Sequence, residues 1–214
     1  IRRLMRKLGL WAVGPKPDTS KPHPEHKVYP YLLRGLAVSQ PNQVWATDIT
    51  YIRTWQGWLY LAVFIDLFSR KIVGWQLSER IDGQLVCDAL QAAMLMRGRP
   101  QGVLIHTDQG SQYCAAAFVQ QIQGFKARQS MSRRGNCWDN APQESFFGHM
   151  KDELASEIPG WTSFEAAKAS IDRWMDYYNN DRCQWDLAKL SPNEYYHYIT
   201  TGEYPAGMLP LWVK

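Results

Sequence analysis

The chain has 214 residues, of which 45% are hydrophobic and 21% charged, with 24 Lys and Arg against 20 Asp and Glu. This composition excludes an overall disordered chain and suits one globular domain with an appendage. The longest apolar run covers residues 58–65, which is too short for a transmembrane helix. Four widely spaced cysteines without a CxxC pair argue against a disulfide framework and a zinc ribbon. They favour a reducing, intracellular compartment.

The net charge of +4 is unevenly distributed along the chain. Residues 1–34 hold eight Lys or Arg and two acids, a net charge of +6, and the remaining 16 basic and 18 acidic residues sum to −2. A basic arm on a slightly acidic body is typical of proteins that bind a polyanion, although a solvated tail without a partner has the same composition. The chain begins at Ile1 and shows no signal-peptide pattern, so we interpret it as a fragment of a longer protein.

The basic arm divides into two predicted parts. Apolar residues at helical spacing predict a helix end over residues 2–10, and five prolines between residues 14 and 30 predict an extended linker. We therefore assign the arm and linker to residues 1–38, a folded domain to residues 39–196 and a C-terminal tail to residues 197–214.

Beyond residue 41 the pattern becomes typical of strands. Residues 44–52, 58–68 and 71–77 are rich in β-branched and aromatic residues, and short turns between them predict an antiparallel meander. Two shorter segments, 103–106 and 127–131, predict a fourth and a fifth strand.

Helices are predicted between and after these strands. Apolar residues at helical spacing predict them at residues 83–97, 115–123, 140–154 and 163–179. In the third helix, Asn140 and Gln143 have the spacing of a capping box. The order βββαβαβ followed by helices predicts an α/β fold, a mixed five-stranded sheet with helices on both faces plus C-terminal helices.

Three acidic residues stand out from this framework. Asp48 lies inside an apolar strand, where an acid is costly unless it is paired or binds a metal. Asp108 directly follows a strand, and Glu144 shares one face of its helix with Lys151. Taken singly, Asp108 also fits an ordinary turn acid and Glu144 a solvated helix face. Together, three carboxylates provide the oxygen-only ligands that Mg²⁺ or Mn²⁺ prefers.

Two such ions, about 3.5–4 Å apart, would support in-line phosphoryl transfer at a phosphodiester. Lys151, which lies two turns beyond Glu144, would hold a phosphate. The chemistry predicted from these residues is cleavage or transfer at a nucleic-acid backbone.

Three sequence blocks then carry a resemblance to a known family. They read WATDITY at residues 45–51, HTDQGSQY at 106–113 and GNCWDNAPQESFF at 135–147. These blocks resemble those of insertion-sequence DDE transposases of the integrase-core (rve) superfamily, second-frame (OrfB-like) chains. The 35 residues between Asp108 and Glu144 also match that group.

The likeness covers residues 41–196. Its tail block, at residues 178–192, resembles the end of the same domain, except that Gln184 stands where the family often has His. That departure puts in doubt any role for position 184, but it does not affect the three acids.

The resemblance implies an RNase H-like fold in which Asp48, Asp108 and Glu144 are the catalytic residues and the ligands of two Mg²⁺ or Mn²⁺ ions. It implies a transposase that nicks the 3′ ends of a mobile element and joins them to another DNA strand. The implied partners are double-stranded DNA, at the element ends and the target, and further copies of the chain, in the bacterial cytoplasm at the nucleoid and away from membranes. Residues 1–38 resemble the end of a helix-turn-helix region, and we interpret them as its remnant.

Contacts with DNA are expected from basic and aromatic residues outside the three acids. These residues are Lys151 on the helix of Glu144, Arg133, Arg134 and Trp138 before that helix, and Arg2, Arg3, Arg6 and Lys7 in the arm. His106, two residues before Asp108, is predicted to be structural. Two other functions stay open, an RNase H-like nuclease or resolvase that does not join strands and a non-catalytic DNA-binding protein derived from a transposase.

Overall fold

Five strands form a single sheet in the order β3-β2-β1-β4-β5 in the computed structural model, which describes residues 7–8, 28–133 and 141–205. The strands are β1 (Val44–Thr54), β2 (Gly57–Asp66), β3 (Ile72–Ser78), β4 (Leu104–Thr107) and β5 (Arg128–Met131). β1, β2 and β3 form the predicted antiparallel meander, whereas β4 and β5 continue the sheet in parallel from β1. The predicted mixed sheet is confirmed.

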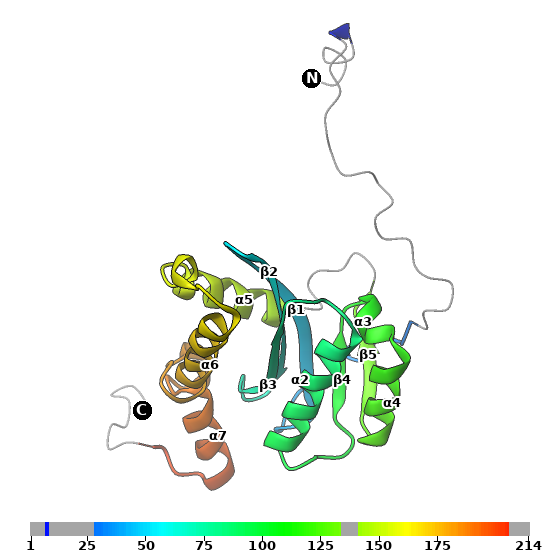
Figure 1. The fold of residues 1–214 in the computed structure, drawn as a ribbon. Coiled ribbons are helices and arrows are strands. Elements are labelled where there is room, and N and C mark those ends of the chain that lie inside the picture. Colours follow the sequence, from blue (N-terminus) through cyan, green and yellow to red (C-terminus); the bar gives the residue numbers. More distant parts are fainter. Residues whose placement is uncertain (1–6, 9–27, 134–140, 206–214) are drawn as a thin grey trace.

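Six α-helices are assigned within the described residues. They are α2 (Gly83–Met96), α3 (Ser111–Cys114), α4 (Ala116–Gly124), α5 (Ala141–Leu154), α6 (Phe164–Asn180) and α7 (Pro192–Thr201), with 3₁₀ turns at Ile158–Gly160 and Trp185–Leu187. α2, α3 and α4 lie on one face of the sheet, and α5 and α6 lie on the other, with α7 beside α6 (Figure 1). Helices on both faces and additional C-terminal helices are therefore confirmed. No helix in the described part of the chain is long and apolar enough to cross a membrane.

The face under α2 and α4 is held by close packing. Trp45 and Phe64 from the strands and Leu90 and Phe118 from the helices are fully buried in one cluster. The backbone of α2 lies directly against β3, because a Cβ atom added at Gly74 would come within 2.5 Å of the Ala93 amide nitrogen. Glycine at this position lets the helix approach the sheet closely.

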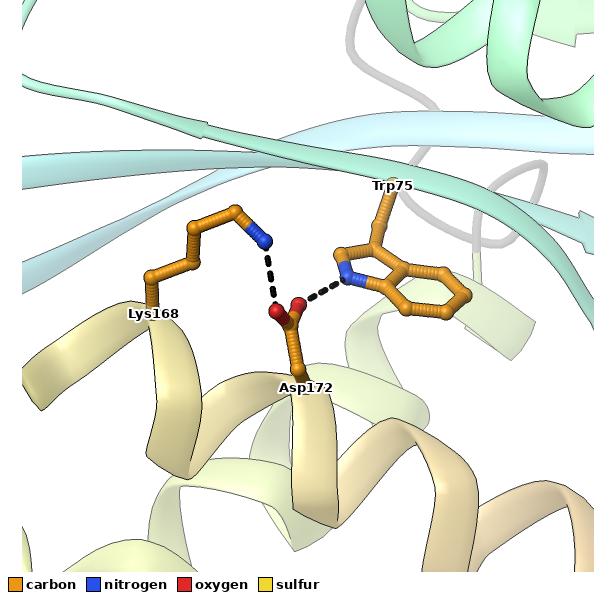
Figure 2. Close-up of polar contacts among 3 residues, drawn as sticks. All are labelled: Trp75, Lys168 and Asp172. Carbon is orange, nitrogen blue, oxygen red and sulfur yellow. Dashed lines mark hydrogen bonds and ion pairs between the residues drawn. The ribbon is translucent and has the colours of Figure 1, made fainter. Parts of the chain in front are cut away.

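The opposite face is covered by α5 and α6. Phe146 on α5 packs edge-on against Trp174 of α6, above buried side chains of β2 and β3. Polar contacts also attach α6 to β3. The Trp75 indole donates a hydrogen bond of 2.8 Å to Asp172, which also pairs with Lys168 one turn earlier (Figure 2).

Asn179, in the tail block, makes a second polar link between α6 and the sheet. Its side chain accepts a hydrogen bond from the Ile72 amide at 2.9 Å and donates one to the Ile72 carbonyl at 3.0 Å. These two bonds satisfy the backbone of an edge strand, and they place the end of α6, with the residues that follow it, beside β3.

The segment before the sheet packs against the other edge strand. The Pro30 carbonyl accepts a hydrogen bond from the Met131 amide, and the Leu32 amide donates to the Ser130 hydroxyl. The ring of Tyr31 lies edge-on to His106, 5.7 Å between centroids. This segment covers an otherwise open sheet edge.

His106 has the structural role that was predicted for it. The imidazole is fully buried, and its two nitrogens lie 3.1 Å from the Ser130 hydroxyl and 3.2 Å from the Ser132 hydroxyl. Both polar atoms of the ring are therefore used within the protein, which links β4 to β5.

The close approach of α2 to β3 leads to a first prediction. Gly74→Ala should destabilise the protein by about 1–3 kcal/mol or more, because its methyl group would collide with helix backbone that cannot rotate away. Gly148→Ala is the control. Its methyl group would meet nothing within 4 Å on α5, and it should stabilise by about 0.5–1 kcal/mol. Urea denaturation measures the change in the free energy of unfolding for both variants. Equal changes in Gly74→Ala and Gly148→Ala would contradict the close packing of α2 on β3.

Candidate active site on β1 and after β4

Asp48 lies within β1, and Asp108 directly follows the neighbouring parallel strand β4. Ala46 on β1 pairs with His106 on β4, and each acid lies two residues further along its chain. Neighbouring strands are about 4.8 Å apart, so the register brings the two acids side by side. Asp48 lies opposite Val63, whose side chain belongs to the cluster under α5 and α6. The Asp48 carboxylate thus faces the α5 side of the sheet.

The turn after β4 holds the Asp108 carboxylate in place. One of its oxygens accepts a hydrogen bond of 2.9 Å from the Gly110 amide. A Cβ atom at position 110 would lie only 2.9 Å from the same oxygen, so glycine leaves room for this contact. Burial raises the pKa of the Asp108 carboxyl above its ordinary value, and the Gly110 hydrogen bond offsets part of that effect.

Asp66 shows what a purely structural acid looks like in this fold. It is almost fully buried, and its carboxylate accepts hydrogen bonds from the backbone amides of Asn42, Phe68 and Ser69 at 2.6, 2.9 and 3.0 Å. All of that hydrogen-bonding capacity serves the loops at the start of β1 and the end of β2. Among the described residues, the Asp108 carboxylate accepts one such bond, so its oxygens have lone pairs that could bind a cation.

A buried tyrosine lies within electrostatic reach of both acids. Tyr113 on α3 is fully buried, with its hydroxyl 3.3 Å from that of Thr47. Its pKa is raised well above the ordinary value, mainly by burial and further by the charges of Asp48 and Asp108. Both carboxylates therefore lie within electrostatic reach of one phenol, which agrees with the strand register.

Gln143 positions its neighbour, Glu144, near Asp48. The Gln143 side chain is fully buried, and its amide nitrogen donates to the Ala46 carbonyl at 2.7 Å and to the Val63 carbonyl at 3.2 Å. The Ala46 carbonyl belongs to β1, which carries Asp48, and the Val63 carbonyl belongs to β2, opposite Asp48. The first turn of α5 is thereby attached to the sheet beside Asp48, and Glu144 is exposed next to the attachment.

Gln143 is a functional residue that the sequence pattern concealed. Its spacing predicted a capping box with Asn140, but Asn140 lies outside the described residues and the Gln143 amide nitrogen anchors α5 to β1 and β2. No local signal shows this role, because the two acceptors lie far away in the sequence. On α5, Phe146, Met150 and Leu154 are buried, whereas Glu144 is exposed.

The predicted DNA contacts are placed only in part. Lys151 is half-buried on α5, two turns beyond Glu144. Arg133 is exposed, and its guanidinium carbon lies 4.8 Å from the centroid of the Tyr31 ring. The preceding residue, Ser132, donates its amide hydrogen to the Thr107 carbonyl. Arg133 therefore lies near the end of β4 that precedes Asp108. Lys7 is exposed. The other expected contacts, Arg2, Arg3, Arg6, Arg134 and Trp138, lie outside the described residues.

The three acids are directed to one end of the sheet, but they do not form a closed cluster. Among the described residues, no group of three or more His, Cys, Asp or Glu side chains converges closely enough to hold a metal ion. The donor chemistry nevertheless fits Mg²⁺ or Mn²⁺, because all three candidate ligands are carboxylates and burial already disfavours the charge of Asp108. Carboxylates without a cation between them repel one another, which favours an open arrangement.

Comparison with known proteins identifies the family. Residues 38–137 match an integrase core domain model, and residues 126–192 match a second one. The transposase for insertion sequence element IS904 of Lactococcus lactis subsp. lactis is 37% identical over 210 aligned positions, which cover 92% of this chain and 79% of that protein. The chain belongs to the insertion-sequence transposases. The transposase InsF for insertion sequence IS3A of Escherichia coli (strain K12) is 49% identical over 183 positions, 77% of this chain.

This chain covers 61% of the length of the InsF transposase. Solved structures agree with the fold of the transposase chain. A chain of the simian T-cell lymphotropic virus intasome superposes with a TM-score of 0.66 and 19% identity over 87% of this chain and 65% of that one. The HTLV-2 integrase catalytic core domain, solved in complex with magnesium, superposes with a TM-score of 0.61 and 18% identity over 73% of this chain and 97% of that one. The RNase H-like fold expected from the resemblance is confirmed.

The attachment of α5 leads to a second prediction. Gln143→Met keeps the approximate volume of the side chain but leaves the carbonyls of Ala46 and Val63 without its amide, which should cost about 1–3 kcal/mol of stability. Gln123→Met on the exposed face of α4 is the control and should change stability by less than about 0.5 kcal/mol. Chemical denaturation compares them, and indistinguishable variants would show that Gln143 does not anchor the helix.

The burial of Asp108 leads to a third prediction, for the protein without metal. A carboxyl whose pKa is higher in the folded state lowers stability above that pKa, and the penalty disappears as the pH falls and the group is protonated. Asp108→Asn should therefore stabilise at neutral pH, by on the order of 1 kcal/mol, with a gain that shrinks in acid. Asp66→Asn should do the reverse and destabilise. Thermal unfolding in EDTA, from neutral to acidic pH, measures the stability of both variants. A lower stability of Asp108→Asn at neutral pH would refute the interpretation.

Proposed function

We propose that this transposase chain carries the catalytic centre that nicks the 3′ ends of a mobile DNA element and joins them to target DNA. The observation that carries the proposal is the register of β1 and β4, which places Asp48 and Asp108 at the same level. Gln143 attaches α5 beside Asp48 and so brings Glu144 to the same end of the sheet. Membership of the insertion-sequence transposases supports assigning this arrangement to DNA strand transfer.

Asp48, Asp108 and Glu144 are the residues that would hold two divalent ions, Mg²⁺ or Mn²⁺. Their carboxylate oxygens match the preference of these ions, and the related integrase core was solved with magnesium. When bound, the ions would supply an activated attacking oxygen and stabilise the leaving oxygen of an in-line displacement. The cation would also compensate the buried charge of Asp108.

The other residues would position the reacting groups. The Gly110 amide directs the Asp108 carboxylate, and Gln143 fixes the turn that carries Glu144. Lys151 lies further along α5 and would neutralise a phosphate of the bound strand, and Arg133 would do so at the Asp108 end of the sheet. In the first step a water would attack the phosphodiester at the 3′ end of the element, and the 3′ oxygen would leave as a hydroxyl. In the second step this 3′-hydroxyl would attack a phosphodiester of the target strand, and the target's own 3′ oxygen would leave.

The proposed partners are double-stranded DNA and further copies of the chain. A transposase must act on two element ends, and the intasome with a similar fold is an assembly, which supports an oligomer on DNA. The basic residues 1–34 favour binding to phosphates through charge neutralisation, whereas the body of the chain has a net charge of −2. The relatives come from bacteria, and we propose the nucleoid of a bacterial cytoplasm as the place of action.

The test of this function is a joining assay. Asp108→Asn and Glu144→Gln should each reduce metal-dependent joining to background while binding to the same DNA is kept, since both remove a carboxylate but leave the fold intact. The substrate is a duplex with the terminal sequence of the element and a pre-cut 3′ end, and joined products are resolved on a denaturing gel. Glu165→Gln is the matched control, because Glu165 is an exposed acid in the first turn of α6, as Glu144 is in α5.

The outcomes separate the possible functions. Normal joining by Glu144→Gln, or loss of joining in Glu165→Gln, would contradict the roles assigned here. With an uncut terminal duplex as a second substrate, nicking without joined products from the unaltered chain would indicate a nuclease or resolvase, and the absence of metal-dependent cleavage would indicate a non-catalytic DNA-binding protein.

A further inference from the structure

A groove with a volume of about 580 Å³ lies between α5 and the segment that follows α6. Its α5 wall includes Ala141, Ser145 and His149, which are spaced by four residues and so form one helical stripe. Ser145 directly follows Glu144, so this stripe is adjacent to the one that carries the proposed catalytic acid. The groove and Glu144 therefore lie on neighbouring stripes of the same helix.

The opposite wall brings together cations from distant parts of the sequence. Arg70, in the turn between β2 and β3, and Arg182, just after α6, both line the groove. Burial raises the pKa of the Tyr178 phenol, and the Gln184 hydrogen bond and the charges of Arg182 and Arg70 offset part of that effect. Both guanidinium groups therefore lie near one phenol in the groove wall. Arg182 also pairs with Glu153 at 2.9 Å, which leaves Arg70 as the less compensated charge.

Trp185 supplies an aromatic surface at the same groove. Its side chain is 79% exposed, and the ammonium of Lys189 lies 4.4 Å from the centroid of its ring. An exposed indole of this size has no packing function in the described fold. Such rings, combined with cations, are the usual platforms for unpaired bases.

The loop that presents Trp185 is held firmly by its own contacts. The Gln184 amide donates to the Leu190 carbonyl and the Lys189 amide donates to the Gln184 carbonyl, both at 3.0 Å, and Leu187 is buried beneath the loop. Ala188 and Lys189 have φ values of 55° and 63°, a left-handed conformation that is unfavourable for residues other than glycine. Strain of this kind persists where the surrounding structure requires it, and it gathers at ligand sites.

We propose that this groove binds a single DNA strand next to the active site, with its phosphates at Arg70 and Arg182 and one unpaired base on Trp185. The proposal rests on the proposed function, because strand transfer exposes single strands at the cut ends. A single strand is favoured over a duplex because a base must leave its stack to reach the indole. The site would also use the tail block, which the three acids leave without a chemical role.

The first experiment measures binding of a fluorescein-labelled mixed-sequence single strand in EDTA, where no joining takes place. Trp185→Ala should weaken this binding by about 5- to 150-fold, the range that loss of one stacked base gives. Trp55→Ala is the matched control, because Trp55 is 84% exposed on the β1–β2 hairpin, outside the groove. Unchanged binding by Trp185→Ala, or equal weakening in both variants, would overturn the proposal.

Arg70 provides an independent variant with little risk to the fold. Its φ of 58° is tolerated by asparagine, so Arg70→Asn removes the charge and keeps the turn. The slope of log affinity against log salt should become shallower by about 0.7, the value for one phosphate contact on a single strand. An unchanged slope would show that Arg70 does not contact the strand.

Cys183 offers a direct readout, because it lines the groove and its thiol is exposed. Its alkylation by a maleimide, followed by mass spectrometry, should slow several-fold when the single strand is added, and Trp185→Ala should abolish this protection. Alkylation that proceeds at the same rate with and without the strand would refute the site. None of these readouts requires catalysis. If Cys183 is protected in a chain that fails to join DNA, the proposed function is wrong but the groove site stands.

Discussion

The parallel pairing of β1 with β4 is the interaction on which the rest of the structure depends. It sets Ala46 against His106 and so determines that Asp48 and Asp108 lie side by side at the end of the sheet. A parallel pair needs a connection that crosses the sheet, and here β3 is followed by α2, which lies along one face. That crossing requires α2 to sit flat against β3, which Gly74 permits. Gly74 on β3 thus contributes to the connection that lets β4 pair with β1, and this pairing positions Asp48 and Asp108.

The electrostatics of the site follow from this arrangement. Two acids side by side, one of them partly withdrawn from water, are unfavourable for a metal-free protein. Asp66 shows how the fold stabilises a buried acid when no ligand is involved, through three backbone amides. Within the described residues, Asp108 accepts one such bond, from Gly110. A divalent cation at the proposed site would compensate its charge and would also let a body with net negative charge accept a polyanion.

Much of this architecture could be predicted from sequence, because its signals are local. Alternating and helical periodicities placed the five strands and four of the helices, and the spacing of three acids indicated the chemistry. α3 was missed because it is one turn long, and α7 was missed because it buries only Pro192 and so shows no apolar stripe. Contacts between distant residues were not predictable, since neither the Gln143 anchor nor the approach of Arg70 to Arg182 leaves a trace in nearby sequence.

α5 links these features, because each side of it has a different partner. Phe146 and Met150 fill the interface with the sheet and α6, and Gln143 connects the first turn to β1, which carries Asp48, and to β2. The remaining surface carries two adjacent stripes, one with Glu144 and Lys151 and one with Ser145 and His149. If both proposals hold, one stripe of this helix would face the reacting phosphate and the next would face the strand bound in the groove. Since both stripes belong to one rigid helix, any shift of its anchor at Gln143 would move the acid and the groove together.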